Sequence, residues 1–286
     1  MADLKDIRKR ISSVQNTRQI TRAMKMVAAA KLRRCQEQLY HVRTYAEKHD
    51  LIIQHLLNQE SDYHEFFPYT QEGKGDHLII VMAADRGLCG GYNASIIRET
   101  KSHLHNLNNK NESYKLVLIG KKAIEGLKYF LTEDNTLTFS DNYLDFGYSQ
   151  ILAASIIERF HQKTIKTVKI ISGTYRNILT QTIKATTFLP FEQNLSSLKN
   201  APTYILTEPT PQKLLPIIFE HNLATQIYKL ICENATCEQA ARMTAMDNAT
   251  RNANDMIADL QLVYNQTRQA HITSELMEII SGAQAS

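Results

Sequence analysis

Three glycines within five residues form the part of this sequence that looks most like a phosphate-binding loop. In VMAADRGLCGGYNAS (81–95) an apolar run ends, the glycines follow, and a helical pattern begins. Backbone N–H groups at the start of a helix bind anions, so a nucleotide site is one interpretation. The loop reads GLCGG, however, and matches neither GxGxxG nor the GK[ST] ending of a P-loop. A tight strand-to-helix turn without a ligand is the alternative, and the missing lysine favours it.

The other reactive side chains show no catalytic or metal-binding pattern. The sequence has no GxSxG and no HExxH segment, and its cysteines lack CxxC spacing (Cys35, Cys89, Cys232 and Cys237). Cys232 and Cys237 lie on a predicted helix and cannot bond to each other without breaking it. We therefore expect no catalytic residue, no cofactor, no metal and reduced thiols, as in a protein on the cytoplasmic side.

The elements that must position these residues fall into three parts. None of the ten glycines occurs in residues 1–72 or 174–281, so both ends favour helices and the middle holds the turns. A chain of 286 residues is long enough for two domains of about 150 residues each. Its longest strictly apolar run, residues 78–84, is far shorter than the about 20 residues of a membrane span. The net charge of +4 is too small to indicate a partner.

Residues 3–57 show the heptad pattern of one long coiled-coil helix. Positions at alternating steps of three and four are mostly apolar: Leu4, Ile7, Ile11, Val14, Arg18, Thr21, Lys25, Ala28, Leu32, Cys35, Leu39, Val42, Ala46, His49, Ile53 and Leu56. The pattern is interrupted between positions 18 and 25, where Ile20, Met24 and Val27 fall on an adjoining face. Two interpretations stay open: a local stutter of the coiled coil, or contact with a different neighbour.

The C-terminal part repeats this pattern. The heptad positions are Met246, Ala249, Ala253, Met256, Leu260 and Val263. We expect the helix to begin near Thr210 with Pro211 in its first turn, although Pro216 leaves that start uncertain, and to end near Gly282. Residues 1–50 carry 12 Lys/Arg against 5 Asp/Glu, and residues 211–286 carry 5 against 8. The opposite net charges, +7 and −3, weakly favour an antiparallel pair of the two helices.

The middle of the chain predicts a small α/β domain. The expected strands are 77–84, 114–120, 136–140 and 167–175, with 178–188 pairing beside the last, and the expected helices are 93–107, 121–130 and 149–164. In the third helix Ile151, Ala154, Ser155, Ile157 and Phe160 are expected near one face. Strands that alternate with helices indicate a mainly parallel sheet with right-handed crossovers.

Polar residues interrupt the C-terminal pattern near the chain's end. Arg268, Gln269 and Thr273 lie in an otherwise apolar helix, and Arg242 falls on the heptad seam itself. Any one of them suits a solvated face. Together with the polar interruption near residue 21, they indicate a shaft that touches several partners through specific polar contacts.

Three motifs in order resemble the gamma subunits of F-type ATP synthases of the bacterial type. They are IRKRISSVQNTRQITRAMKMVAAAKLRR, DRGLCGGYN and the segment from EQAARMTAMDNATRNA to ELMEIISGA, so the resemblance spans the whole chain. It implies an α/β protein with a long antiparallel two-helix coiled coil, formed by the N- and C-terminal segments, and a central Rossmann-like domain with a mainly parallel sheet. The expected parts are coiled-coil helices 1–60 and 211–286, linkers 61–76 and 191–210, and the α/β domain 77–190.

The resemblance also implies a function. The chain would be a non-catalytic rotor shaft that couples rotation of the membrane ring of c subunits to ATP synthesis or hydrolysis in the beta subunits. Its partners would be the hexamer of alpha and beta subunits, the epsilon subunit and the c ring, without nucleic acid. It would lie at the inner membrane, peripherally, on the cytoplasmic side.

Eight residues match subunit-contact positions of that family. Arg268, Gln269 and Thr273 match the upper polar contact with beta. Met24, Lys25 and Arg242 match positions near the contact region of the coil. The turn would project Arg86 and Cys89 outward, toward an acidic loop of beta.

Two other functions remain as alternatives at this point. A nucleotide-binding enzyme with coiled-coil arms would use the α/β domain and the GLCGG loop. A passive coiled-coil scaffold would use the terminal helices alone.

Overall fold

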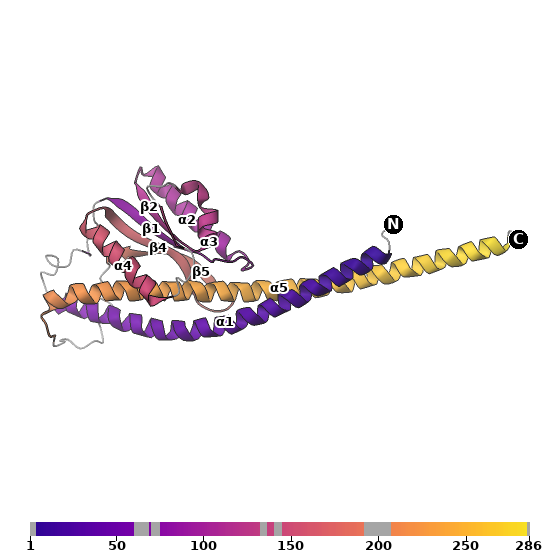
Figure 1. Ribbon diagram of the computed structural model, residues 1–286, viewed down its shortest axis with the longest axis horizontal. Coiled ribbons are helices and arrows are strands. Elements are labelled where there is room, and N and C mark those ends of the chain that lie inside the picture. Colours follow the sequence, from indigo (N-terminus) through magenta and orange to yellow (C-terminus); the bar gives the residue numbers. More distant parts are fainter. Residues whose placement is uncertain are drawn as a thin grey trace. The chain divides into compact units, whose positions relative to one another are not determined.

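The computed structural model describes residues 4–59, 69, 75–131, 136–139, 145–191 and 207–284. Within it the chain forms two compact units, one of Met1–Ala29 with Arg242–Ser286 and one of Ala30–Ala241. Most of the two predicted linkers lies outside the described residues, so the predicted domain limits stay a prediction. Figure 1 shows the elements of each unit.

Two long helices contribute to both units. Helix α1 runs from Leu4 to Gln59 and helix α5 from Pro211 to Gln284. The carbonyl of Thr210 accepts bonds from the backbone N–H groups of Lys213 and Leu214, so α5 starts where the sequence predicts. It continues through Pro216 and does not end at Gly282.

Within residues 30–241 the two helices pair antiparallel. Arg43 of α1 bonds Glu233 of α5, with Nη2 2.8 Å from Oε1. Further along α1, the carbonyl of Ala46 accepts a bond from Gln226 at 3.3 Å. Partner numbers fall along α5 as they rise along α1, which confirms the predicted antiparallel arrangement.

The sheet of this unit has five strands in the order β3-β2-β1-β4-β5. Their bounds are β1 Asp76–Met82, β2 Tyr114–Ile119, β3 Thr136–Phe139, β4 Ile165–Tyr175 and β5 Gln181–Leu189. The first four are parallel, and β5 pairs antiparallel with β4. The helices between the strands are α2 Tyr92–Asn109, α3 Lys121–Gly126, the 3₁₀ turn Lys128–Phe130 and α4 Phe146–His161. The predicted mainly parallel α/β domain is confirmed.

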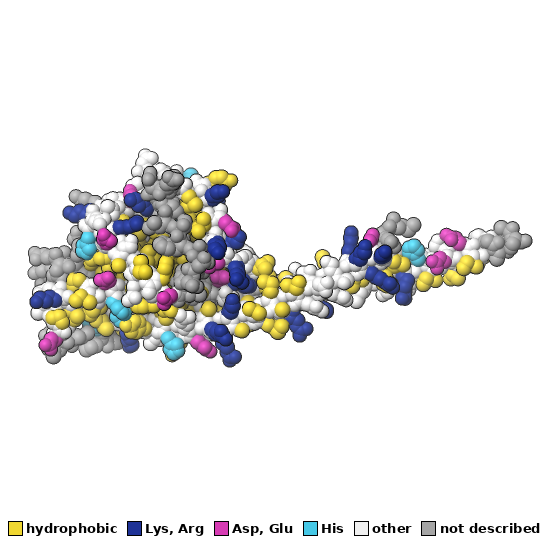
Figure 2. Space-filling model, viewed as in Figure 1, with side chains coloured by type: hydrophobic (Ala, Val, Ile, Leu, Met, Phe, Trp, Pro, Cys, Tyr) yellow, Lys and Arg dark blue, Asp and Glu magenta, His cyan; other side chains and the backbone are white. Residues whose placement is uncertain are grey.

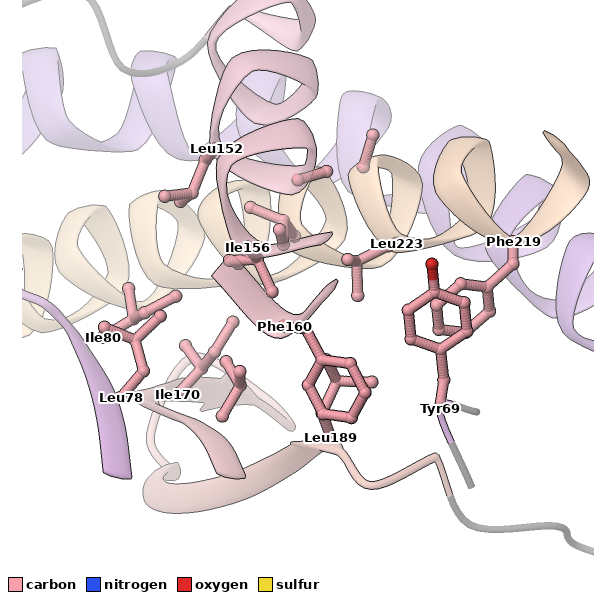
Figure 3. Packing of buried hydrophobic residues seen from close by; sticks show 14 of the residues in the cluster. Tyr69, Leu78, Ile80, Leu152, Ile156, Phe160, Ile170, Leu189, Phe219 and Leu223 are labelled. Atoms are coloured by element: carbon pink, nitrogen blue, oxygen red, sulfur yellow. The ribbon is translucent and has the colours of Figure 1, made fainter. Parts of the chain in front are cut away.

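Alternating residues of the strands build two cores, one on each face of the sheet. On one face Leu78 and Ile80 of β1 pack with α4 and with the portions of α1 and α5 in this unit. Figure 3 shows Phe219 of α5 stacked beside Tyr69 in this core, with ring centroids 4.5 Å apart. On the other face Ile79 packs with α2, α3 and Cys237 of α5. Successive residues of β1 point to opposite faces of the sheet, and both faces are covered. The strand is therefore apolar at nearly every position.

Helix α4 is turned relative to the prediction. Ser149, Leu152, Ala153, Ile156 and Phe160 are buried, whereas Ile151 is 71% exposed. Of the predicted face only Phe160 holds a fully buried position. The prediction was wrong because apolar residues occur on more than half of this helix, so periodicity alone does not define the buried stripe.

Gly120 is required where β2 turns into α3. Its φ is +95°, and an added Cβ would lie 2.2 Å from the carbonyl oxygen of Ala83. Both the left-handed backbone and the overlap with main-chain atoms oppose any side chain there.

We expect Gly120→Ala to lower the free energy of unfolding by about 2–4 kcal/mol, because strain and overlap add. Urea unfolding of the purified chain measures it. Gly87→Ala is the control, since an added Cβ at Gly87 meets no atom within 4 Å. Equal effects at the two glycines would contradict the structural explanation.

Candidate functional site

The glycine loop lies at the carboxyl end of β1, where a doubly wound sheet would hold a nucleotide. Its backbone is bound by the protein's own side chains. The N–H of Ala84 donates to Oδ1 of Asn93 at 3.1 Å, and Nδ2 of Asn93 lies 3.2 Å from Sγ of Cys89. Asp85 accepts a bond from the N–H of Lys121 at the start of α3. These bonds hold the loop as a tight turn rather than as an open loop that could bind an anion.

The crevice between β1 and β4, where the strand order reverses, is occupied by Tyr92 and α5. The hydroxyl of Tyr92 lies 2.6 Å from Oδ1 of the buried Asn234 on α5. A Cβ at Gly173 of β4 would come within 2.2 Å of that hydroxyl. The nucleotide-binding hypothesis loses its main support, because a side chain and a helix fill the position of the ligand.

The loop side chains divide into one that is exposed and one that is not. Arg86 is exposed, as predicted. Cys89 is only 2% exposed and packs in the core beneath α2. The prediction that both side chains project outward was wrong for Cys89, because the turn directs its sulfur inward to Asn93.

The buried thiols of α5 are free. Cys232 and Cys237 are unpaired with each other, as predicted. Burial raises the pKa of Cys232 to about 12 and also raises that of Cys237. Thiols in this state are poor nucleophiles, because the thiolate is the reactive form. Among the residues that the structure describes, no group of three His, Cys, Asp or Glu side chains is arranged to hold a metal ion.

In the unit of residues 1–29 and 242–286, the polar interruption of the α1 seam meets polar residues of α5. The hydroxyls of Thr21 and Thr250 lie 2.9 Å apart. Nζ of Lys25 lies 2.6 Å from Oδ1 of Asp247. Within this unit the polar positions of the α1 seam therefore face α5, instead of turning to another neighbour.

The same register extends toward the N-terminus of α1. Arg18 donates to Oδ1 of Asn254 at 3.3 Å, and Arg8 donates to the hydroxyl of Tyr264 at 2.6 Å. We call the set Arg8, Arg18, Thr21, Lys25, Asp247, Thr250, Asn254 and Tyr264 the polar seam. The sequence did not identify its α5 members; pairing the two helices antiparallel and searching for polar residues opposite Arg8 to Lys25 would have found them.

The predicted α5 seam is correct at every second position. Met246 and Ala253 are buried, but Met256 is 55% exposed and Val263 is 44% exposed. Ile257 is buried in their place. The apolar search passed over Thr250, which holds a seam position, and so placed every second seam residue one position too early.

The two remaining coil candidates differ in exposure. Met24 is half-buried, whereas its neighbours Ile20 and Val27 are exposed on the adjoining face. Arg242 is buried. Thus the adjoining face of α1, and not the seam, presents apolar side chains outward.

Beyond the polar seam α5 continues as an exposed helix. Every residue from Arg268 to Ser281 is exposed, including the candidates Arg268, Gln269 and Thr273. Large apolar side chains are exposed with them: Ile272, Leu276, Met277, Ile279 and Ile280. Figure 2 shows hydrophobic side chains along this end of α5. Residues 268–281, here called the α5 end, form the largest concentration of exposed apolar side chains on one described helical segment.

The ion pair of the polar seam is sensitive to pH. The hydrogen bond from Lys25, supported by Arg251, lowers the pKa of Asp247 below its ordinary value of 3.8. A lowered folded-state pKa contributes stability above the unfolded-state value, and this contribution is lost as the pH falls through the folded-state value.

We therefore expect Asp247→Asn to lower the thermal midpoint at pH 7 and to have progressively less effect below the ordinary pKa of the carboxyl. Circular dichroism melts between pH 7 and pH 3 measure this. In a Lys25→Met background the effect should be smaller. A difference between the parent protein and the Asp247→Asn variant that is constant with pH would exclude the ion pair as its cause.

Comparison with known proteins gives one consistent result. The family model described as "ATP synthase" matches residues 3–285. Curated proteins named "ATP synthase gamma chain" from Pelagibacter ubique and Jannaschia sp. are each 39% identical over the full length of both chains. None of the helices in the described part of the chain combines the length and hydropathy that crossing a bilayer requires.

Solved structures agree with this. A chain from the Tetrahymena thermophila mitochondrial ATP synthase central stalk and c ring is similar, with a TM-score of 0.59 and 26% identity, covering 80% of this chain and 99% of that one. A chain from the Euglena gracilis mitochondrial ATP synthase has a TM-score of 0.66 over 99% of this chain and 94% of that one. At 18% identity the second likeness supports the fold alone.

Proposed function

Because this chain belongs to the ATP synthase gamma chain family, we propose that it is the central rotor shaft of an F-type ATP synthase. It turns with the membrane ring of c subunits and couples that rotation to conformational change in the catalytic beta subunits, for ATP synthesis or hydrolysis. The observation that carries the proposal is the α5 end, a helical segment whose apolar side chains are all exposed.

The α5 end needs a partner that covers it. Most helical stability in proteins comes from packing of an apolar face, which this part of α5 lacks, and exposed apolar side chains mark a surface that another molecule covers. Ile272, Leu276 and Ile280 lie near one face because they are four residues apart. Arg268 and Gln269 lie on the same side, one turn earlier. A surrounding hexamer of alpha and beta subunits would cover this face with an apolar sleeve and a few polar contacts.

The shaft itself is non-catalytic in this proposal. The crevice where a doubly wound domain binds nucleotides holds Tyr92, and the loop backbone bonds Asn93. The α/β domain would instead serve as the base of the rotor, beside the epsilon subunit and the c ring. The complex would place the chain peripherally at the inner membrane, on the cytoplasmic side.

The contact residues take separate roles. Arg268, Gln269 and Thr273 would meet beta at the α5 end. Lys25 would act mainly within the polar seam, because Asp247 already binds its ammonium group. Met24 would contact the hexamer beside it, and Arg242, being buried, would hold the coil in shape.

Cys89 supports the glycine loop from inside, whereas Arg86 would meet a carboxylate of a neighbouring subunit. This assignment corrects the symmetric role that the sequence predicted for these two residues.

The proposal is tested by assembling the chain with alpha and beta subunits of its source and attaching a bead to the α/β domain. ATP-driven rotation is expected. A stable complex that hydrolyses ATP at full rate without this chain turning would contradict the shaft role.

At the α5 end, Arg268→Ala combined with Gln269→Ala should lower torque and the ATP synthesis rate several-fold, because contacts with beta are lost. Proteoliposomes with an imposed proton gradient measure the rate. Gln261→Ala is the control, since that residue is exposed before the α5 end. Unchanged synthesis in the double variant would favour a passive scaffold.

At the glycine loop, Arg86→Glu should change the ATP hydrolysis rate of the complex, and the change should shrink at high salt because screening weakens the repulsion. The matched control is Lys101→Glu, an exposed charge reversal on α2. If both variants behave like the parent enzyme, Arg86 does not face a carboxylate.

A further inference from the structure

One guanidinium joins three elements in the unit of residues 30–241. Arg43 of α1 directs Nε and Nη2 to Oε1 of Glu233 on α5, at 3.0 and 2.8 Å. Its Nη2 also donates to the backbone carbonyl of Tyr175, the last residue of β4, at 2.9 Å. Arg43 therefore binds the second long helix and the sheet at the same time.

A second hydrogen bond joins α1 to the same strand end. Nε2 of Gln36, about two turns from Arg43 on α1, donates to the hydroxyl of Tyr175 at 2.6 Å. Tyr175 thus accepts one bond through its backbone and one through its side chain, both from α1. We call the set Gln36, Arg43, Tyr175 and Glu233 the base clamp.

The base clamp lies in a part of α1 that has no share in the two apolar cores of the sheet. The α1 residues in those cores are Ile53, Leu56 and Leu57. Over residues 30–50, all of which the structure describes, the hydrogen bonds of α1 to the described strands go to Tyr175. Residues of α5, in contrast, pack in both cores as far as Cys237. The attachment of residues 30–50 to the sheet therefore depends on polar bonds.

Hydrogen bonds fix the rotation of a helix more closely than apolar contacts do. Apolar contact depends little on direction, whereas a hydrogen bond weakens steeply when its angle changes. Gln36 and Arg43 are seven residues apart, so they lie on one face of α1, about 10 Å apart along its axis. Rotation of α1 about this axis would carry both side chains away from Tyr175. It would also separate Arg43 from Glu233, which is only 5% exposed and therefore costly to leave without its arginine.

We propose that the base clamp transmits torque between the α/β domain and α1, with Arg43 as the residue that positions both long helices against the sheet. This role rests on the proposed rotor function, because a turning shaft is what loads the junction. Without the clamp, α1 would stay paired with α5 but would twist more easily relative to the sheet. Part of each angular step would then be taken up elastically.

Backbone amide exchange of the purified full chain tests the clamp independently of rotation. Arg43→Met should speed exchange over residues 30–50, because local opening there no longer breaks bonds to Glu233 and Tyr175. Residues 51–59 should exchange as in the parent chain, since that segment packs in a core of the sheet. Arg34→Met, at an exposed arginine of the same helix, is the matched control. Unchanged exchange over residues 30–50 in Arg43→Met would overturn the clamp.

Torque transmission is tested in the assembled complex, with a bead on the α/β domain and hydrolysis stalled by a non-hydrolysable ATP analogue. The angular fluctuation of the bead then reports the stiffness between the hexamer and the domain. Arg43→Met should increase this fluctuation. Tyr175→Phe removes only the neutral bond to Gln36 and should have about half that effect, because charge-assisted hydrogen bonds are roughly twice as strong as neutral ones.

Gly120→Ala separates torque transmission from stability, because it strains the same unit at a site outside the clamp. Its bead should fluctuate as the parent's does, and an increase equal to that of Arg43→Met would overturn the proposal. So would parental fluctuation in both clamp variants of a rotating complex, which would leave the rotor function intact. If Arg43→Met does not fold, Tyr175→Phe alone decides. A parent complex that does not rotate would contradict the rotor function and with it the torque role, whereas amide exchange would still decide whether the clamp holds α1.

Discussion

The pairing of polar side chains across the two long helices is the constraint on which the coil depends. An apolar seam alone permits sliding by a heptad, because each layer resembles the next. Thr21 against Thr250 and Lys25 against Asp247 fit in one antiparallel register only. A slip would separate both pairs, so the bonded register is favoured over its neighbours by the hydrogen bond and the ion pair. In a shaft that transmits torque, a fixed register keeps the two helices from sliding past each other when one end is twisted.

The α/β domain applies the same principle to a fold that elsewhere binds ligands. Its sheet order places a crevice at the carboxyl ends of β1 and β4. Here Tyr92 enters the crevice and bonds Asn234, so α5 occupies the position of a ligand. Both cores include residues of α5, Phe219 on one face and Cys237 on the other. Residues 211–241 of the helix are thereby held to the sheet by packing on both of its faces.

The sequence predicted most elements because the signals were strong there: continuous apolar strands, glycines confined to the middle of the chain, and heptads uninterrupted by glycine. The prediction was less accurate where a helix has apolar residues on more than one face. Helix α4 has apolar residues on more than one face. Only its contact with the sheet determines that Leu152 is buried and Ile151 is exposed. On α5 a polar residue, Thr250, carries the seam, and apolar periodicity passed over it. Cys89 was misplaced because a turn's side-chain direction depends on its φ angles, which spacing does not report.

The α5 end shows how stability and function oppose each other in this chain. A helix that binds a partner tightly would present a continuous apolar stripe, and a helix that remains exposed to water would present none. Residues 268–281 do neither, since Arg268 and Gln269 share a face with Ile272 and Leu276. Apolar contact favours enclosure, while the polar groups limit adhesion because they exchange readily between partners and water. In the proposed role a surrounding sleeve encloses this segment and the segment turns within it, and the mixture of apolar and polar side chains suits both requirements.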